Sequence, residues 1–203
     1  MKLNIDVIQT ILAGFPHDLR QHSLNVCYLS LKLADYAGYA YEQKRTLIIG
    51  ALLHDIGKSC IDESILNKPG KLTYNEFLIV KQHTILGVKM LEYFKESNEI
   101  LPIILYHHER WDGKGYEGLA GENIPKLASI VTLADAFDAM TSYRPYQKPK
   151  TLTSALKQLN INKGTQFDPN LVVLFESCIL DLTKRPYETS TGKFIDQLIT
   201  NLY

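Results

Sequence analysis

The sequence predicts an all-α protein built as a single-domain helical bundle. Three observations favour this fold class: apolar residues recur at helical spacing through nearly the whole chain, no stretch keeps the alternation of a β-strand, and no internal repeat is evident. The chain has 203 residues, the length of one domain. We expect one domain over residues 1–203, with its core at about 17–180 and a peripheral C-terminal extension over 182–203.

The first two expected helices are followed by a loop. The helix over residues 18–36 places His22 on the same face as its apolar residues Leu19, Val26, Leu29 and Leu33. The second helix, 41–54, leads into Gly57, which suits a helix C-terminus. The chain from 59 to 72 is expected to be a loop, because a proline–glycine pair interrupts it.

Two more helices and a long loop make up the middle of the chain. Thr73 and Glu76 form the capping-box pattern of a helix that is expected to run to about residue 94. Another helix is expected over residues 98–108. Residues 109–125 contain four glycines among polar and aromatic residues, which predicts a long structured loop. Such loops are usually functional.

The last third of the chain returns to helical patterns. Residues 126–142 have helical apolar spacing, and residues 151–159 form a short helix. Asp168 and Pro169 are typical of an N-cap followed by the first helical position, so a helix is expected from there to about residue 180. Residues 182–203 are expected to add one peripheral helix.

Composition and charge narrow the functional classes. Lys plus Arg and Asp plus Glu both number 22, so the formal net charge is zero and no broad basic surface for long nucleic acid is expected. No run approaches the roughly 20 apolar residues of a membrane-spanning helix, and the N-terminus is a poor signal peptide. We therefore expect a cytoplasmic protein without a membrane segment. The unpaired cysteines are interpreted as small buried groups: Cys27, Cys60 and Cys178.

An ordered set of histidines and aspartates carries the chemistry of the chain. The members of this set are His22, His54, Asp55, His83, His107, His108 and Asp135. Imidazole and carboxylate groups together suit divalent ions such as iron, manganese or zinc. The absence of thiolates near them argues against a cysteine-rich structural zinc site. His17, the remaining histidine, is interpreted as a surface residue beside a helix start.

The pair His54 and Asp55 follows an apolar helix. A carboxylate is costly to bury at such a place unless it is paired or bound to a metal. Neighbours on a helix point about 100° apart, so one residue can bind a metal squarely while the other bridges to a second ion. Lys58 lies one turn after His54 and places a cation beside the same site.

A carboxylate in a second apolar helix is a further metal-ligand candidate. Asp135 needs a partner if it is buried, and a metal ion is the simplest one. Asp138 competes for this role, and one of the two is expected to lie on the helix surface. His107 and His108 close another apolar helix and precede a loop of glycine, aromatic and basic residues, which is suited to a close approach to a ligand.

These motifs resemble the signatures of HD-GYP domains, a family of the HD superfamily of metal-dependent phosphohydrolases. Residues 54–58 resemble the HD signature, and residues 107–116 resemble the second HD-GYP signature. Further blocks follow in the same order at 133–142, 144–146 and 164–169, so that the resemblance covers about 17–180. Glu117 departs from the family pattern, which has a proline at this position.

The resemblance implies an HD-type helical fold and a phosphodiesterase that opens the cyclic dinucleotide c-di-GMP to linear pGpG and often GMP. It implies one metal held by His22, His54, Asp55 and Asp135. It implies a second metal, to which Asp55 bridges, held by His83, His107 and His108. Iron or manganese is expected, with zinc or nickel as alternatives. Asp18, one turn before His22, either binds a third ion or caps its helix.

The resemblance also implies roles for residues around the metals. Asp55 and Lys58 are the expected catalytic residues. The expected substrate contacts are Lys58, Arg110, Trp111, Lys114, Tyr116 and Arg144, with Trp111 or Tyr116 stacking on a base. The loop over 112–118 is a candidate docking surface for a partner. The sequence leaves the oligomeric state and the regulatory input open.

Two other functions compete with the first. One is an HD phosphohydrolase that acts on a different cyclic dinucleotide, such as cyclic GMP-AMP, or on a mononucleotide. The other is a regulatory module that binds c-di-GMP but turns it over poorly. Glu117 is the one sequence feature that favours this last alternative, because every expected metal-ligand position is filled.

Overall fold

The computed structural model describes residues 3–95, 97–143 and 148–184. Within this part the chain is all-helical, apart from an isolated β-bridge between Lys163 and Phe167. The predicted all-α class is therefore confirmed. The elements are α1 (Ile5–Ala13), α2 (His17–Tyr36), α3 (Tyr41–Leu53), η1 (Ile56–Cys60), α4 (Glu63–Leu66), α5 (Tyr74–Lys81), α6 (His83–Leu91), α7 (Leu101–Tyr106), η2 (Gly121–Asn123), α8 (Lys126–Thr141), α9 (Leu152–Ile161) and α10 (Pro169–Lys184).

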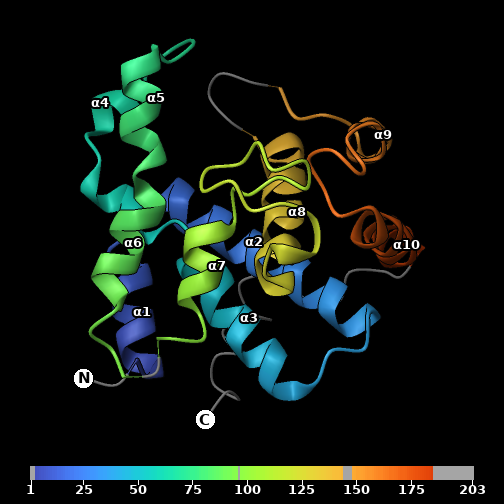
Figure 1. Cartoon of the computed structure of the whole chain (residues 1–203), viewed down its shortest axis with the longest axis horizontal. Helices are drawn as coiled ribbons and strands as arrows, with labels where there is room; N and C mark the ends of the chain where they lie inside the picture. Colours follow the sequence, from blue (N-terminus) through green and yellow to red (C-terminus); the bar gives the residue numbers. More distant parts are fainter. Residues whose placement is uncertain (1–2, 96, 144–147, 185–203) are drawn as a thin grey trace.

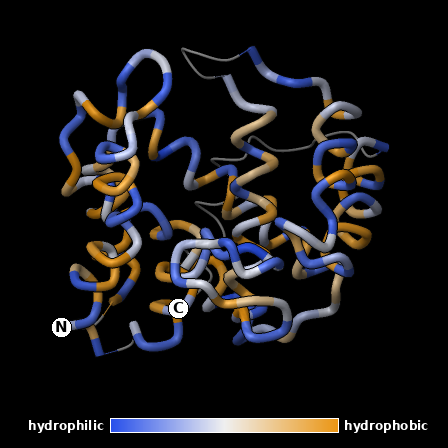
Figure 2. Tube along the Cα trace, turned by 45° about the horizontal axis from the view of Figure 1, so that its top comes forward, coloured by the Kyte–Doolittle hydropathy of each residue, from blue (hydrophilic) through white to orange (hydrophobic). Residues whose placement is uncertain are grey.

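Helices α2, α3, α7 and α8 lie at the centre of the molecule (Figure 1). Helices α1 and α4 to α6 lie on one side of this centre, and α9 and α10 lie on the other. Hydrophobic and hydrophilic segments alternate along the helices in Figure 2, as expected for amphipathic helices that pack by one face. None of the helices in the described part of the chain is both long and apolar enough to span a bilayer.

Two central helices are buried over consecutive residues rather than along one stripe. All seven residues from 47 to 53 of α3 are buried, and so are all seven from 128 to 134 of α8. A helix that is apolar on all sides belongs in the interior of a protein. Gly50 permits the packing of α3 on α7, since a Cβ at this position would lie 2.4 Å from the Cδ1 of Ile103. Polar residues at the ends of these helices are thereby brought into the core.

The structure differs from the predicted helices in the first half of the chain. Helix α1 was not predicted, although its N-cap Asn4 accepts a hydrogen bond from the backbone of Val7 and it buries Ile8 and Leu12. The expected loop over 59–72 begins within η1 and contains the short helix α4. These elements are short, and their apolar residues do not repeat over enough turns to establish a period.

The helix expected from residue 73 to about 94 is divided at Gln82 into α5 and α6. The capping box of Thr73 and Glu76 is present as predicted. At the division, the Nδ1 of His83 donates a hydrogen bond to the carbonyl oxygen of Val80 at 2.7 Å, so a side chain takes the place of a helical N–H. The division turns the His83 ring inward.

Gly57 has a different role from the predicted one. It lies inside η1 rather than just after a helix, and its φ is not in the left-handed region. Instead, η1 crosses α6 so closely that a Cβ on Gly57 would lie 1.9 Å from the carbonyl oxygen of His83 and 2.6 Å from the nitrogen of Gly87. The glycine is needed for this close approach.

The cysteines and the C-terminal helix differ in part from the predictions. Cys27 and Cys178 are buried as expected, but Cys60 is exposed, so the prediction was wrong for this residue. Cys60 lies at the end of η1, where its Sγ is 3.7 Å from the Sδ of Met90. Helix α10 runs on to Lys184, and the rest of the expected extension, residues 185–203, lies outside the described residues.

Candidate metal centre

Two clusters of histidines and aspartates meet between the central helices and α6. In each cluster, one nitrogen or oxygen atom per residue lies within 4.8 Å of the corresponding atoms of the others. The first cluster consists of His22 on α2, His54 at the end of α3 and Asp135 on α8. The second consists of Asp55, His83 at the start of α6, and His107 and His108 just after α7. The structure therefore brings together all seven residues of the predicted set.

Asp55 lies between the two clusters and is almost fully buried, with 1% of its side chain exposed. Its Oδ1 is 3.2 Å from the Nε2 of His83 and 3.8 Å from the Nε2 of His107. Its Oδ2 is 3.3 Å from the Nε2 of His54 and 3.6 Å from the Nε2 of His22. One carboxylate oxygen thus faces each cluster, which is the arrangement of a bridging ligand.

Three of the histidine rings are held in the same way. In each, Nδ1 lies within hydrogen-bonding distance of the carbonyl oxygen three residues earlier: His54 with Ala51 at 2.8 Å, His83 with Val80 at 2.7 Å and His107 with Ile104 at 2.9 Å. Because a carbonyl oxygen can only accept, Nδ1 carries the hydrogen and Nε2 keeps its lone pair. Hydrogen bonds of this kind orient histidines that bind metals.

His22 is held by a carboxylate instead. Its Nδ1 is 2.7 Å from the Oδ2 of Asp138, and the Oδ1 of Asp138 accepts bonds from Asn25 at 2.9 Å and Ser142 at 2.6 Å. Asp138 is 3% exposed, and Asp135, with 18% of its side chain exposed, lies in the first cluster, so neither has the plain helix-surface role that was predicted for one of the two. Both point toward α2, since they are three residues apart on α8.

Asn25 and Ser142 were not predicted as parts of the site. Both residues nevertheless lie at helical spacing from residues of the site. Asn25 lies three residues after His22, and Ser142 lies four residues after Asp138. Neither could be singled out without the knowledge that α2 and α8 are packed together, as the structure shows.

The carboxylates of the site are strongly acidic. Burial raises the pKa of Asp55, but the positive charge of Lys58 and the contacts with His54 and His83 outweigh burial and hold it well below its ordinary value. The Nζ of Lys58 is 2.5 Å from the Oδ2 of Asp55. Burial also raises the pKa of Asp135, and the hydrogen bond and charge of His22 outweigh it and lower this pKa. Both carboxylates are therefore ionised at neutral pH, as metal ligands must be.

Three histidines of the site have shifted pKa values, and the shifts differ in direction. Burial lowers the pKa of His108 to about 4 and that of His107 well below its ordinary value. These rings are therefore neutral at pH 7 and can offer a lone pair. Burial lowers the pKa of His22 as well, but its hydrogen bonds to Asp135 and Asp138 outweigh this and raise it to about 9. In the absence of a metal, His22 is thus a protonated partner of two carboxylates.

The residues of the clusters fit divalent metal ions. His54 Nε2 and Asp55 Oδ1 are buried and have no hydrogen-bond partner in the described part of the chain. Buried polar atoms are nearly always satisfied, so these two indicate a missing ligand. Imidazole nitrogens and carboxylate oxygens are the donors that iron, manganese and zinc share. The arrangement is consistent with a binuclear metal site.

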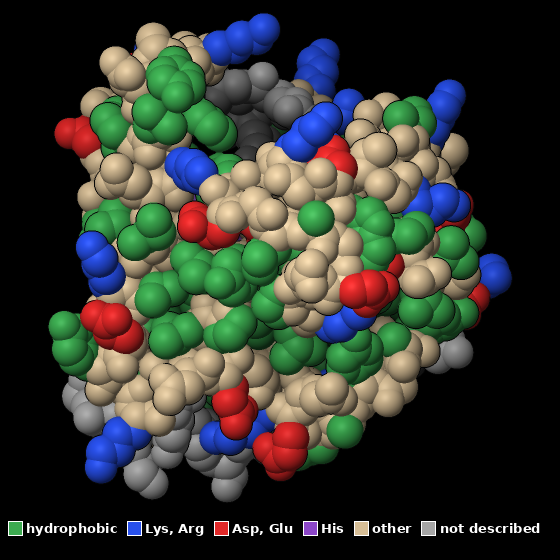
Figure 3. Space-filling model, viewed as in Figure 1, with side chains coloured by type: hydrophobic (Ala, Val, Ile, Leu, Met, Phe, Trp, Pro, Cys, Tyr) green, Lys and Arg blue, Asp and Glu red, His purple; other side chains and the backbone are tan. Residues whose placement is uncertain are grey.

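Asp18 lies outside both clusters. Its side chain is 89% exposed, and its Oδ1 is 3.2 Å from the Nδ1 of His17, which is 90% exposed. The expected surface position of His17 is confirmed. No histidine side chain appears on the face drawn in Figure 3, which agrees with the burial of His54, His83 and His107.

The residues predicted to contact the substrate do not all lie beside the clusters. The ring of Tyr116 lies 4.7 Å from that of His108, next to the second cluster. Arg110 forms two hydrogen bonds to Asp112, at 3.0 and 2.8 Å, within the loop. The same loop is hydrogen-bonded to the segment that precedes α10: the backbone N–H of Trp111 donates to the carbonyl oxygen of Gln166 at 3.1 Å. Lys114 is exposed, and Arg144 lies outside the described residues.

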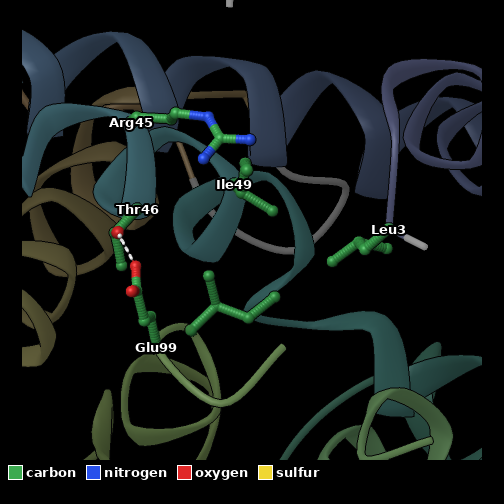
Figure 4. Close-up of a pocket in the computed structure, with 6 residues that line it drawn as sticks. Leu3, Arg45, Thr46, Ile49 and Glu99 are labelled. Atoms are coloured by element: carbon green, nitrogen blue, oxygen red, sulfur yellow. Dashed lines mark hydrogen bonds between the residues drawn. The ribbon is translucent and has the colours of Figure 1, made fainter. Parts of the chain in front are cut away.

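The cavity drawn in Figure 4 is separate from the clusters. It has a volume of about 20 Å³ and is lined by Leu3, Arg45, Thr46, Ile49, Glu99 and Ile100. Thr46 donates a hydrogen bond to Glu99 at 2.9 Å across it. None of the seven cluster residues lines this cavity, and it is too small for a nucleotide.

The chain thus has an all-helical fold with one aspartate between two histidine clusters. This combination is typical of helical proteins that bind a pair of metal ions. The chain belongs to the HD domain family, whose model matches residues 6–171. The family assignment predicted from the motifs is thus confirmed.

The chain is similar in sequence to proteins named as cyclic dinucleotide phosphodiesterases. The chain is 40% identical over 183 residues to a cyclic di-GMP phosphodiesterase of Thermotoga maritima, which covers 86% of this chain and 49% of the relative. It is 37% identical over 156 residues to the 3′3′-cGAMP-specific phosphodiesterase 2 of Vibrio cholerae, which covers 75% of this chain and 30% of the relative. The chain thus spans half or less of the length of these relatives.

Solved structures share the fold. Bd1817, an HDG"Y"P protein from Bdellovibrio bacteriovorus, matches with a TM-score of 0.64 and 26% identity over 78% of this chain and 51% of its own. The HD domain of the phosphodiesterase PgpH from L. monocytogenes, in complex with cyclic-di-AMP, matches with a TM-score of 0.64 and 18% identity over 91% of this chain and 98% of its own. The predicted HD type of the helical fold is confirmed.

Proposed function

We propose that this chain is a metal-dependent phosphodiesterase that hydrolyses c-di-GMP to linear pGpG, with GMP as a further product. The position of Asp55, with one oxygen toward each histidine cluster, is the observation that carries the proposal. Relatives named as cyclic di-GMP phosphodiesterases, at 40% and 43% identity, support the choice of substrate. A second candidate substrate is 3′3′-cGAMP, because relatives named as specific for it are 36 to 38% identical.

The clusters have assigned roles under this proposal. One ion would be held by His22, His54 and Asp135, the other by His83, His107 and His108, and Asp55 would bind both. When bound, two divalent ions supply the Lewis acidity that activates a water and offsets the charge developing on the phosphoryl oxygens. We assign iron or manganese to the site, with zinc or nickel as alternatives.

The side chains around the clusters orient the substrate. Lys58 keeps Asp55 ionised, and its side chain is 27% exposed, so it is available to a substrate phosphate. Tyr116 offers an aromatic face to a base beside His108. Arg110, Trp111, Lys114 and Arg144 are assigned further contacts to the substrate, with Arg110 already positioned by Asp112.

Product analysis tests the proposal. The protein is purified without oxygen, loaded with Fe²⁺ or Mn²⁺ and incubated with c-di-GMP, 3′3′-cGAMP and cyclic GMP as the mononucleotide. We expect linear dinucleotide from c-di-GMP, and the ratio of kcat/KM values decides between the two cyclic dinucleotides. Loaded protein that cleaves no member of the panel contradicts the proposal. Tight binding of c-di-GMP without cleavage identifies a regulatory module instead.

A further inference from the structure

The peptide group between Tyr116 and Glu117 is held at both of its polar atoms. The Nζ of Lys81 donates to the carbonyl oxygen of Tyr116, and the N–H of Glu117 donates to the Oε1 of Glu109 at 2.5 Å. A cation on the oxygen and a carboxylate on the nitrogen complement the dipole of the peptide. Hydrogen bonds with one charged partner are stronger than neutral ones.

The carboxylate in this arrangement is deeply buried. Glu109 is 2% exposed, and its Oε2 has no partner in the described part of the chain. The loop folds tightly over it, since a Cβ on Gly115 would lie 2.5 Å from the Cα of Glu109. A buried carboxylate is costly unless it is bonded, so its bond to Glu117 fixes the path of the loop.

The arrangement places an aromatic ring beside the second cluster. The ring of Tyr116 is tilted by 42° against that of His108, at 4.7 Å. The Nζ of Lys81 lies 5.3 Å from the centre of the same ring, and the ring of Phe77 lies 6.0 Å from it at an interplanar angle of 88°. Lys81 is the last residue of α5 and Glu109 directly follows His108, so Tyr116 is held from two separate elements.

The second hydrogen bond requires a residue other than proline at position 117. Proline, which HD-GYP domains have at this position, carries no N–H and could not donate to Glu109. The side chain of Glu117 is exposed, and only its backbone N–H takes part. In this chain a hydrogen bond restrains the loop at the point where a proline ring would restrain φ.

We propose that Lys81 and Glu109 are positioning residues that clamp the Tyr116–Glu117 peptide and so set the orientation of Tyr116 toward the substrate. The clamp is supported by the two hydrogen bonds of the Tyr116–Glu117 peptide, and it does not depend on the proposed function. Its effect on substrate binding rests on the proposed function, so the clamp is tested by one measurement that needs no turnover and one that does.

Amide hydrogen exchange tests the clamp without substrate. We expect Glu109→Leu to speed the exchange of the Glu117 amide roughly tenfold, because it removes a bond to a charged group. Glu109→Gln keeps an accepting Oε1 and is expected to keep the slow exchange, as is Glu117→Ala, which keeps the N–H. Equal exchange rates in the wild type and in either Glu109→Leu or Lys81→Met overturn the proposal. Lys81→Met provides this answer if Glu109→Leu does not fold.

Steady-state kinetics test the positioning. Lys81→Met is expected to raise KM for the cyclic dinucleotide roughly five- to tenfold with kcat nearly unchanged, because Tyr116 binds substrate and no metal ligand is altered. Lys89→Met, an exposed lysine on α6, is the matched control and is expected to keep the wild-type KM. A fall in kcat alone, or an unchanged KM, contradicts the positioning role. If the wild type cleaves nothing, the proposed function fails, while hydrogen exchange still decides on the clamp.

Discussion

Asp138 shows how the charge of one buried residue supports the metal centre. It accepts from His22, Asn25 and Ser142 together, so its carboxylate holds His22 from the side opposite to Asp135. Its pKa is raised by burial, but the hydrogen bond from His22 outweighs this and lowers it. A charged partner behind a metal-binding imidazole orients the ring and raises its basicity.

Asp138→Asn removes this charge and keeps the shape of the side chain. We expect a loss of roughly 10- to 100-fold in metal affinity, because the ring of His22 loses its charged partner. Competition with a chelator measures the affinity. Asp181→Asn, on α10 and with 46% of its side chain exposed, is the control. An affinity in Asp138→Asn equal to that of the control would show that the hydrogen bond has no role in the site.

At the scale of elements, the crossing of η1 over α6 positions the centre of the site. Asp55 and Lys58 flank the crossing on one side, and His83 starts the helix on the other. A Cβ on Gly57 would lie 2.6 Å from the nitrogen of Gly87, and a Cβ on Gly87 would lie 2.8 Å from the Cγ2 of Ile104. The distance between Asp55 and His83 therefore depends on two residues without side chains.

Gly57→Ala is expected to push η1 away from α6. The added Cβ would lie 1.9 Å from the backbone oxygen of His83, which cannot rotate away. We expect a loss of about 1–3 kcal/mol or more in the free energy of unfolding, together with a loss of bound metal. Thermal unfolding and metal content are the measurements. Gly14→Ala is the control, because its Cβ would meet nothing closer than 3.4 Å. If both variants behave alike, the close approach is not required.

The start of α5 depends on pH. Hydrogen bonds from Lys68 and Thr73 lower the pKa of Glu76 to about 2, from an ordinary value of 4.5. A pKa that is lowered by folding stabilises the folded state above the unfolded value, and this stabilisation is lost as the pH falls from 4.5 to 2. The protection of the α5 amides, measured as the ratio of the intrinsic exchange rate to the observed rate, should therefore fall over this interval in the wild type. In Glu76→Gln this protection should already be low at neutral pH, and high protection in this variant would refute the account.

On the scale of the whole molecule, the sequence predicted the elements with a long period and missed the short ones. The buried helices α3 and α8 and the amphipathic α2 could be predicted because their apolar residues extend over several turns. Helices α1 and α4 and the break at Gln82 could not, since they depend on single caps and on a side chain bond from His83.

The site was predictable in its residues but not in its support. The seven cluster residues could be named because histidines and aspartates at the ends of apolar helices are costly without a ligand. Asn25, Ser142 and the clamp of Lys81 and Glu109 depend on which helices and loops pack together. That information comes from tertiary contacts, which one sequence without the fold does not contain.

The central claim is that Asp55 joins two metal sites in one chain. Elemental analysis of protein purified without oxygen tests it most directly, on the wild type and on Asp55→Asn. The account predicts about two ions per chain in the wild type and one or fewer in the variant, with the helical fold unchanged by circular dichroism. A wild type that holds one ion or none after loading, or an Asp55→Asn variant that still holds two, would contradict it.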